Sequence, residues 1–185
     1  RLFDDGSGLV DAKLVRTLKL PGQLEGCVAD DILGHLYIGE EENGIWKFDA
    51  DPSGSKEGVL IDTIGPHIAA DVEGLTLYYA SETDGYLIAS SQGDDTYTIY
   101  SRGDINNFIG RFSVVDSETI DGTSSTDGID VCNMGLGGKL SDGIFIVQDD
   151  VNDVGNQNFK IISWGEIASI FNPPLEINSG YDLRN

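Results

Sequence analysis

A short pattern recurs three times along the chain: an acidic residue, then a glycine, then a run of residues that favours β-strand. The three copies begin at Glu25, Glu73 and Asp127, at intervals of 48 and 54 residues. Further strand-like runs follow each copy, separated by turns rich in Gly, Asp, Asn and Ser. A unit of about four short strands that recurs roughly every 50 residues is the pattern of a β-propeller blade.

The strands of each repeat are predicted from these runs. First strands are expected at 25–29, 73–77 and 127–131, second strands at 34–38, 85–89 and 143–147, and third strands at 45–48, 97–100 and 159–162. Fourth strands are expected at 58–62 and 108–112, and residues 15–20 take the same place before the first repeat. One short helix is expected at 164–171, ended by Asn172-Pro173-Pro174. A β-sandwich would use similar strands, but it does not predict the repeated acid-glycine step.

Three repeats do not close a ring, because propellers have about 4–8 blades and an open arc exposes long strand edges. The expected fold class is therefore all-β, a β-propeller with about three four-stranded blades of a larger ring. The chain opens Arg1-Leu2-Phe3-Asp4-Asp5, without the apolar core of a signal peptide. We expect it to begin at a processing site or within a domain.

Charge and cysteine content narrow the possible partners. The chain has 32 Asp and Glu against 11 Lys and Arg, a net charge of −21, and such a surface repels nucleic acid. No apolar run approaches the roughly 18 residues of a transmembrane helix, so no membrane partner is expected. Cys27 and Cys132 lack the spacing of a structural zinc site and lie in apolar strand-like runs. We expect two buried free thiols, with a disulfide as the alternative.

Acidic residues gather around the repeated pattern. In a propeller the first strands of successive blades line the channel, so Glu25, Glu73 and Asp127 should converge at one end of it. Asp71 shares a strand face with Glu73, and further acids lie in 40–42, 121–127 and 149–153. Converging carboxylates repel one another unless cations bind. Hard oxygen ligands favour Ca²⁺ or Mg²⁺ over zinc or copper. The alternative is that these acids lie at turns, are merely solvated and bind no metal.

Several of these runs together resemble the β-propeller phytases, the alkaline, calcium-dependent 3-phytases of bacteria. The similar segments lie in order between about residues 13 and 170: 25–31, 36–41, 45–48, 71–79, 86–93, 121–131, 147–149, 156–160 and Trp164. The resemblance implies a six-bladed propeller whose C-terminal half is formed by residues 1–185. It also implies a secreted or periplasmic location.

The resemblance further implies stepwise release of phosphate from myo-inositol hexakisphosphate (phytate), with several Ca²⁺ ions and with attack by a calcium-bound water. The calcium ligands that it implies are Glu25, Glu41, Glu73, Asp121, Gly122 (through its carbonyl), Asp127, Asp149 and Asn152. Glu41, Glu73 and Asp127 would position and activate the water, and Asp71 would lie near the adjacent phosphate site. The implied partners are phytate or calcium-phytate and the N-terminal half of the same propeller, which would carry the family's phosphate-binding Lys and Arg residues.

The chain departs from the family's pattern at Val151, where an acid is often found, and the loop that follows is shorter. The 11 basic residues all fall outside the acid-glycine steps and the 121–127 loop, and Lys47, Arg102 and Lys160 are expected away from the channel. Two alternatives stay open: a calcium-stabilised propeller that binds without catalysis, and another calcium-dependent propeller hydrolase of the lactonase type. The second places a His or Asn pair near its metal, and neither His35 nor His67 lies beside an acid-glycine step.

Overall fold

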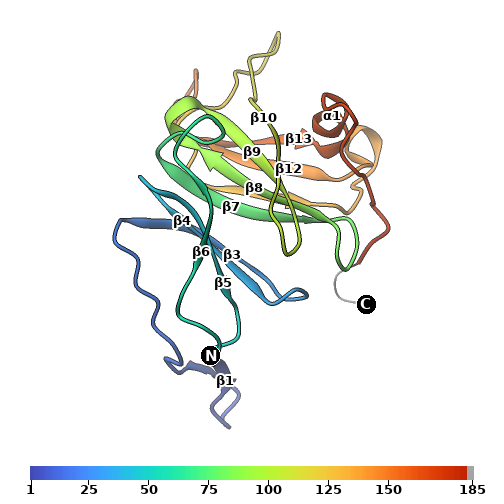
Figure 1. Ribbon diagram of the computed structural model, residues 1–185. Helices are drawn as coiled ribbons and strands as arrows, with labels where there is room; N and C mark the ends of the chain where they lie inside the picture. Colours follow the sequence, from blue (N-terminus) through green and yellow to red (C-terminus); the bar gives the residue numbers. More distant parts are fainter. Residues whose placement is uncertain (183–185) are drawn as a thin grey trace.

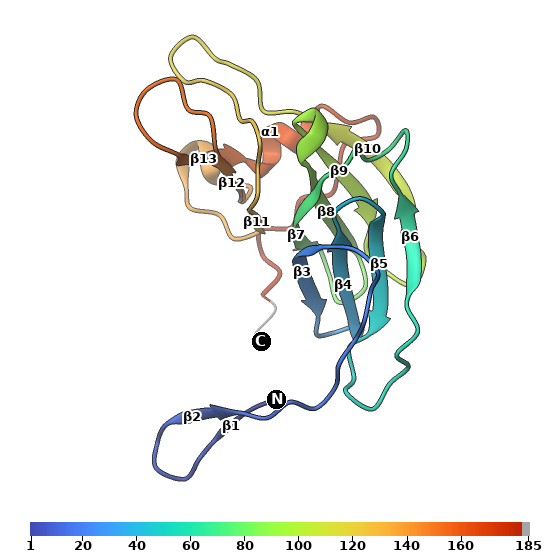
Figure 2. The ribbon, with the colours of Figure 1, turned by 90° about the vertical axis from the view of Figure 1, so that its left-hand side faces the viewer.

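The computed structural model describes residues 1–182 and is built mainly of antiparallel strands. Three larger sheets follow one another in chain order and stack as layers, from blue and teal strands through green to orange (Figure 1). A two-stranded sheet, formed by β1 (Leu2–Asp4) and β2 (Val10–Ala12), projects from the rest at the N-terminus (Figure 2). The expected all-β class is confirmed.

Each larger sheet is formed by strands that are consecutive in the sequence. The first sheet contains β3 (Leu24–Asp30), β4 (His35–Glu40), β5 (Gly44–Asp49) and β6 (Val59–Thr63). The second contains β7 (Val72–Tyr79), β8 (Gly85–Ser91), β9 (Thr96–Ser101) and β10 (Phe108–Phe112). The third contains β11 (Ile129–Cys132), β12 (Ile144–Asp149) and β13 (Asn158–Ser163). The first, second and third strands expected for each repeat are therefore confirmed, as are the fourth strands of the first two.

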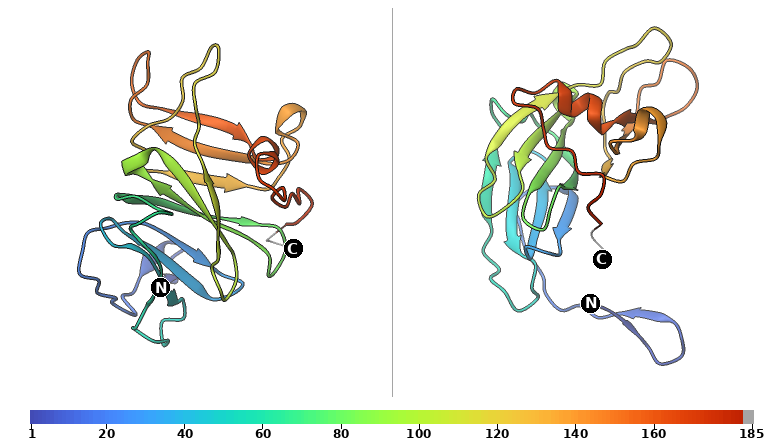
Figure 3. Two further views of the ribbon diagram at one scale, coloured as in Figure 1. Left: turned by 45° about the horizontal axis from the view of Figure 1, so that its top comes forward. Right: turned by 90° about the vertical axis from the view of Figure 1, so that its right-hand side faces the viewer.

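The first strands of the three sheets lie side by side. Strand β7 contacts β3 of the first sheet and β11 of the third, and all three lie toward the middle of the molecule in Figure 2. Figure 3 shows the same stack of sheets from two further directions. Because β7 is covered on both faces, every residue from Val72 to Tyr78 is buried. The acid-glycine steps at the beginnings of β3 and β7 are thus brought next to each other.

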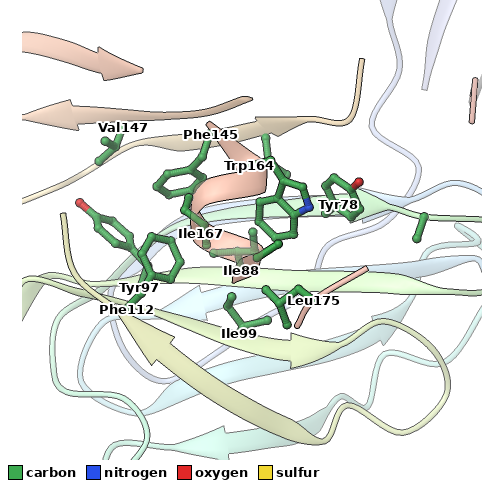
Figure 4. Close-up of a cluster of buried hydrophobic side chains, with 13 residues drawn as sticks. Tyr78, Ile88, Tyr97, Ile99, Phe112, Phe145, Val147, Trp164, Ile167 and Leu175 are labelled. Carbon is green, nitrogen blue, oxygen red and sulfur yellow. The ribbon is translucent and has the colours of Figure 1, made fainter. Parts of the chain in front are cut away.

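Two apolar clusters hold the layers together. One lies between the first and second sheets and includes Tyr37, Ile45 and Leu87, all fully buried. The other lies between the second and third sheets, where the helix α1 (Trp164–Ser169) adds Trp164 and Ile167 to it (Figure 4). The indole ring of Trp164 stacks on Tyr78 with ring centroids 4.3 Å apart. Burial of these apolar and aromatic side chains stabilises the packing of neighbouring sheets.

A buried ion pair also joins the first two sheets. The guanidinium of Arg102 donates from Nε and Nη2 to the two carboxylate oxygens of Asp30, at 2.6 and 2.9 Å, and both side chains are fully buried. The guanidinium lies over the ring of Tyr79, 4.3 Å from its centroid. Between the second and third sheets, Oγ1 of Thr76 donates to Asp130 at 2.8 Å. Loss of either Arg102 or Asp30 would leave the other as an uncompensated buried charge.

Three expectations about secondary structure need correction. Residues 15–20 form no strand, since no strand of the described chain lies beside them to accept backbone hydrogen bonds. The third sheet has three strands instead of four, because the chain after α1 turns back over the core, where Leu175 is buried. The helix ends at Ser169, two residues before the expected end, and two short 3₁₀ helices, η1 (Gln92–Asp94) and η2 (Gly138–Leu140), were not predicted.

The cysteines are free, but the expectation that they are buried is wrong. Cys27 and Cys132 are both exposed. Their strand neighbours Val28 and Val131 face the second sheet, so the cysteines point to the opposite faces of the first and third sheets. No sheet in the described part of the chain covers those two faces. Across residues 1–182, the structure holds no helix long and apolar enough to cross a membrane.

Candidate metal centre

Three of the predicted ligands meet at the beginnings of β3 and β7. Glu25 lies on β3, Glu73 on β7, and Glu41 directly follows β4. One carboxylate oxygen from each lies within 4.8 Å of the other two. Glu73 is buried, Glu41 is half-buried and Glu25 is exposed, so the cluster opens to solvent on one side. We call these three residues the carboxylate cluster.

The glycine of each acid-glycine step explains how the carboxylates come so close. A Cβ on Gly26 would lie 2.2 Å from the carbonyl oxygen of Glu73, and a Cβ on Gly74 would lie 3.0 Å from that of Asp127. Any side chain at these two positions would push neighbouring first strands apart. Strands β3 and β7 also have an irregular register at this step, as in a β-bulge, which redirects side chains from the regular alternation.

Backbone hydrogen bonds fix Glu41 beside the two strands. Its N–H donates to the carbonyl of Gln23 at 3.0 Å, and its own carbonyl accepts from the N–H of Val72 at 3.1 Å. The preceding residue, Glu40, has a different role: it is fully buried and accepts from Trp46 Nε1 at 2.7 Å and from the N–H of Gly22. Of the three consecutive glutamates, Glu41 is therefore the one that the fold directs into the cluster.

The electrostatics of the cluster favour a bound cation. Burial, followed by the charges of Glu25, Asp127, Glu41 and Asp71, raises the pKa of Glu73 to about 7. Burial and then the charges of Asp71, Glu25 and Glu42 also raise the pKa of Glu41. Within residues 1–182, no Lys or Arg forms an ion pair with the three clustered carboxylates. Oxygen ligands that lack a basic partner and open to solvent suit a hard divalent cation such as Ca²⁺.

Asp127 lies at the edge of this cluster, and two glutamines hold it there. Gln92 Nε2 donates to Asp127 Oδ1 at 2.8 Å, and the N–H of Asp127 donates to Gln148 Oε1 at 2.8 Å. Asp127 does not belong to the carboxylate cluster, but its charge helps to raise the pKa of Glu73. Asp71, half-buried, precedes β7, and its carbonyl accepts from the N–H of Gln92 at 2.9 Å. The two glutamines were not singled out from the sequence, because nothing local marks them as partners of Asp127.

The remaining predicted ligands form a second set, which lies around Lys160. Lys160 Nζ is 2.6 Å from Asp121 Oδ1, 3.0 Å from Asp149 Oδ2 and 3.0 Å from Asn152 Oδ1. Asp121 thus joins this second set and not the carboxylate cluster. Gly122 lies beside it in a shallow open concavity of about 160 Å³, which Asp116, Asp153 and Val151 also line.

The sequence predicts only that Lys160 lies away from the channel, and its contacts with these acids were not predicted. The alternation of side chains along β13 explains this contact in the structure. Phe159 and Ile161, the two neighbours of Lys160 on β13, are 70% and 57% exposed, so alternation turns Lys160 to the covered face of its sheet. A lysine on a covered face needs an acidic partner.

The fold and the carboxylate cluster together define an all-β protein with a candidate centre for a hard divalent cation. The phytase family model matches residues 1–185, so the chain belongs to the phytase family. The curated 3-phytase of Bacillus subtilis (strain 168) is 52% identical to it over 172 residues. That alignment covers 90% of this chain and 45% of the relative, so the chain spans less than half the length of this relative.

Proposed function

We propose that the protein carrying this chain is a calcium-dependent phosphomonoester hydrolase that releases phosphate from phytate. The observation that carries the proposal is the carboxylate cluster, in which three glutamates meet without a basic partner in a chain of the phytase family. The similar 3-phytase supports the choice of substrate. At −21, this chain would repel a polyanionic substrate strongly unless cations intervened.

Glu25, Glu41 and Glu73 would hold the principal calcium ion. When bound, calcium supplies positive charge that attracts phosphate oxygens and makes a nearby water more acidic. Gln92 and Gln148 orient Asp127 at the rim of the cluster, where its carboxylate would serve as a further ligand. Asp71, whose charge reaches both Glu41 and Glu73, would lie next to the adjacent phosphate site. The side chains therefore bind and orient, and none is assigned as a nucleophile.

We also propose that the three large sheets are blades of a six-bladed propeller and that residues 1–185 form its C-terminal half. The three glycines of the repeat support this. Gly26 and Gly74 are each met by the backbone of the next first strand, whereas a Cβ on Gly128 would have no atom of residues 1–182 within 4 Å. A further first strand packed on Gly128 would continue the series. The apolar Phe159 and Ile161, on the uncovered face of the third sheet, would be buried by such a neighbour.

The test is phosphate release from phytate by the protein that carries this chain, in calcium and in a chelator. Activity should need calcium, and Glu73→Gln should lower it by at least about tenfold, because the change removes a ligand charge and keeps the side chain's shape. Glu57→Gln, on an exposed loop between β5 and β6, is the matched control and should retain activity. Calcium binding without phosphate release would favour a non-catalytic binding module. Equal activity of the two variants would remove Glu73 from the site.

A further inference from the structure

The ammonium of Lys160 occupies a cage of oxygen atoms. Three side-chain oxygens, from Asp121, Asp149 and Asn152, lie 2.6–3.0 Å from Nζ. The side chain of Lys160 is 8% exposed, that of Asp149 is fully buried, and that of Asp121 is 15% exposed. We call this arrangement the lysine cage. It is separate from the carboxylate cluster, which contains none of these four residues.

The cage depends on the cation for its charge balance. Asp149 Oδ1 accepts from the N–H of Ser124 at 3.0 Å, but Oδ2 receives no aligned hydrogen bond, and Nζ of Lys160 at 3.0 Å is its cationic neighbour. A buried carboxylate without a cation nearby is strongly destabilising. Removal of the ammonium would therefore leave Asp149 buried and uncompensated unless another cation entered.

The cage also anchors the loop that leads to the candidate metal centre. Asp121 Oδ1 accepts from Lys160, while Asp121 Oδ2 accepts from the N–H of Asp153 at 2.9 Å. Asp149, through Ser124, holds the middle of the same loop, which ends at Asp127. These contacts fix the beginning and the middle of the segment 121–127.

We propose that Lys160 is the resident cation of this second oxygen set, so that Asp121, Asp149 and Asn152 are held together without a metal ion. The proposal concerns a site apart from the carboxylate cluster and does not depend on the function proposed above. A divalent ion bound to the same three oxygens would lie beside the ammonium, and the two positive charges would repel each other. Val151, which lines the adjoining concavity, offers no side-chain oxygen in support of a metal.

The test replaces Lys160 by methionine, which keeps the length of the side chain and removes the charge, in the protein that carries this chain. In chelator, Lys160→Met should lower the thermal midpoint by at least about 5 °C. Calcium titration by calorimetry should show one more binding site in the variant than in the wild type, because the emptied cage suits an oxygen-seeking cation. Lys139→Met, at an exposed position on η2, should change neither quantity. An unchanged midpoint in chelator, or an unchanged number of calcium sites, would overturn the proposal.

The wild-type protein gives a second test, which holds even if the variant does not fold. Anomalous diffraction from wild-type crystals soaked in calcium should place no ion among Asp121, Asp149 and Asn152, with Lys160 still in the cage. An ion bonded to these three residues, with Lys160 displaced, would show that the cage is a metal site after all.

Discussion

Replacing Glu73 by glutamine should make the metal-free protein more stable at alkaline pH. Glu73 is 8% exposed and faces the charges of Glu25, Asp127, Glu41 and Asp71. Burial and these charges raise its pKa from 4.5 to about 7. The Glu73 carboxyl loses its proton near pH 4.5 in the unfolded chain and near pH 7 in the folded chain. The folded state therefore loses stability relative to the unfolded state as pH rises between these values.

The size of the effect follows from the same numbers. A shift of one pKa unit corresponds to about 1.4 kcal/mol, so the shift to about 7 sets an upper limit of about 3 kcal/mol. Because the cluster opens to solvent beside the exposed Glu25, screening reduces this to about 1–2 kcal/mol. Glutamine keeps the shape of the side chain and carries no charge at any pH, so the variant avoids that loss.

Urea denaturation in EDTA at pH 4.5 and pH 8 measures the difference. Wild type and Glu73→Gln should be nearly equal at pH 4.5, and the variant should be more stable by about 1–2 kcal/mol at pH 8. Glu57→Gln, on an exposed loop, should follow the wild type at both values. In calcium the order should reverse, because only the wild type keeps the full set of ligands. A variant no more stable than the wild type at pH 8 in EDTA would refute the repulsion argument.

Two further predictions concern calcium and completeness. Calcium at a hundredfold excess over Kd should stabilise the wild-type fold by about 2.7 kcal/mol, which thermal melts would record as a rise of about 5–10 °C over EDTA; identical midpoints would argue against a calcium site in the fold. Residues 1–185 alone should not hydrolyse phytate even with calcium, because Gly128 and the apolar face of the third sheet have no neighbour among residues 1–182 and Lys160 is held in its cage. Addition of the N-terminal half of a related phytase should restore turnover, whereas robust turnover by the isolated chain would contradict the half-propeller proposal.

The strands could be predicted from the sequence because their signals are local. Each repeat carries its own turns and β-favouring runs, and the acid-glycine step marks the beginning of β3 and β7. The failures occurred where neighbours decide the outcome. Residues 15–20 have the composition of a strand but no strand of the described chain beside them. Cys27 and Cys132 lie on sheet faces that no sheet of residues 1–182 covers.

The candidate site was also predictable only where the signal lies within the repeated pattern. Equivalence between repeats brings Glu25 and Glu73 together, and the structure places them in one cluster with Glu41. The contact between Lys160 and Asp121 spans 39 residues of sequence, and no local pattern reports a contact at that separation. The same is true of Gln92, which reaches Asp127 from the neighbouring sheet. Such partners depend on how sheets stack and not on the pattern within one strand.

The central claim, that the carboxylate cluster is a calcium centre, is tested most directly by diffraction from crystals of the protein soaked in calcium and phosphate. We expect an anomalous peak bonded to carboxylate oxygens of Glu25, Glu41 and Glu73 at about 2.3–2.6 Å, with phosphate beside it. The account would be contradicted if the cluster held only water in these crystals. For that result to count, protein dissolved from the same crystals must still release phosphate from phytate in a calcium-dependent way.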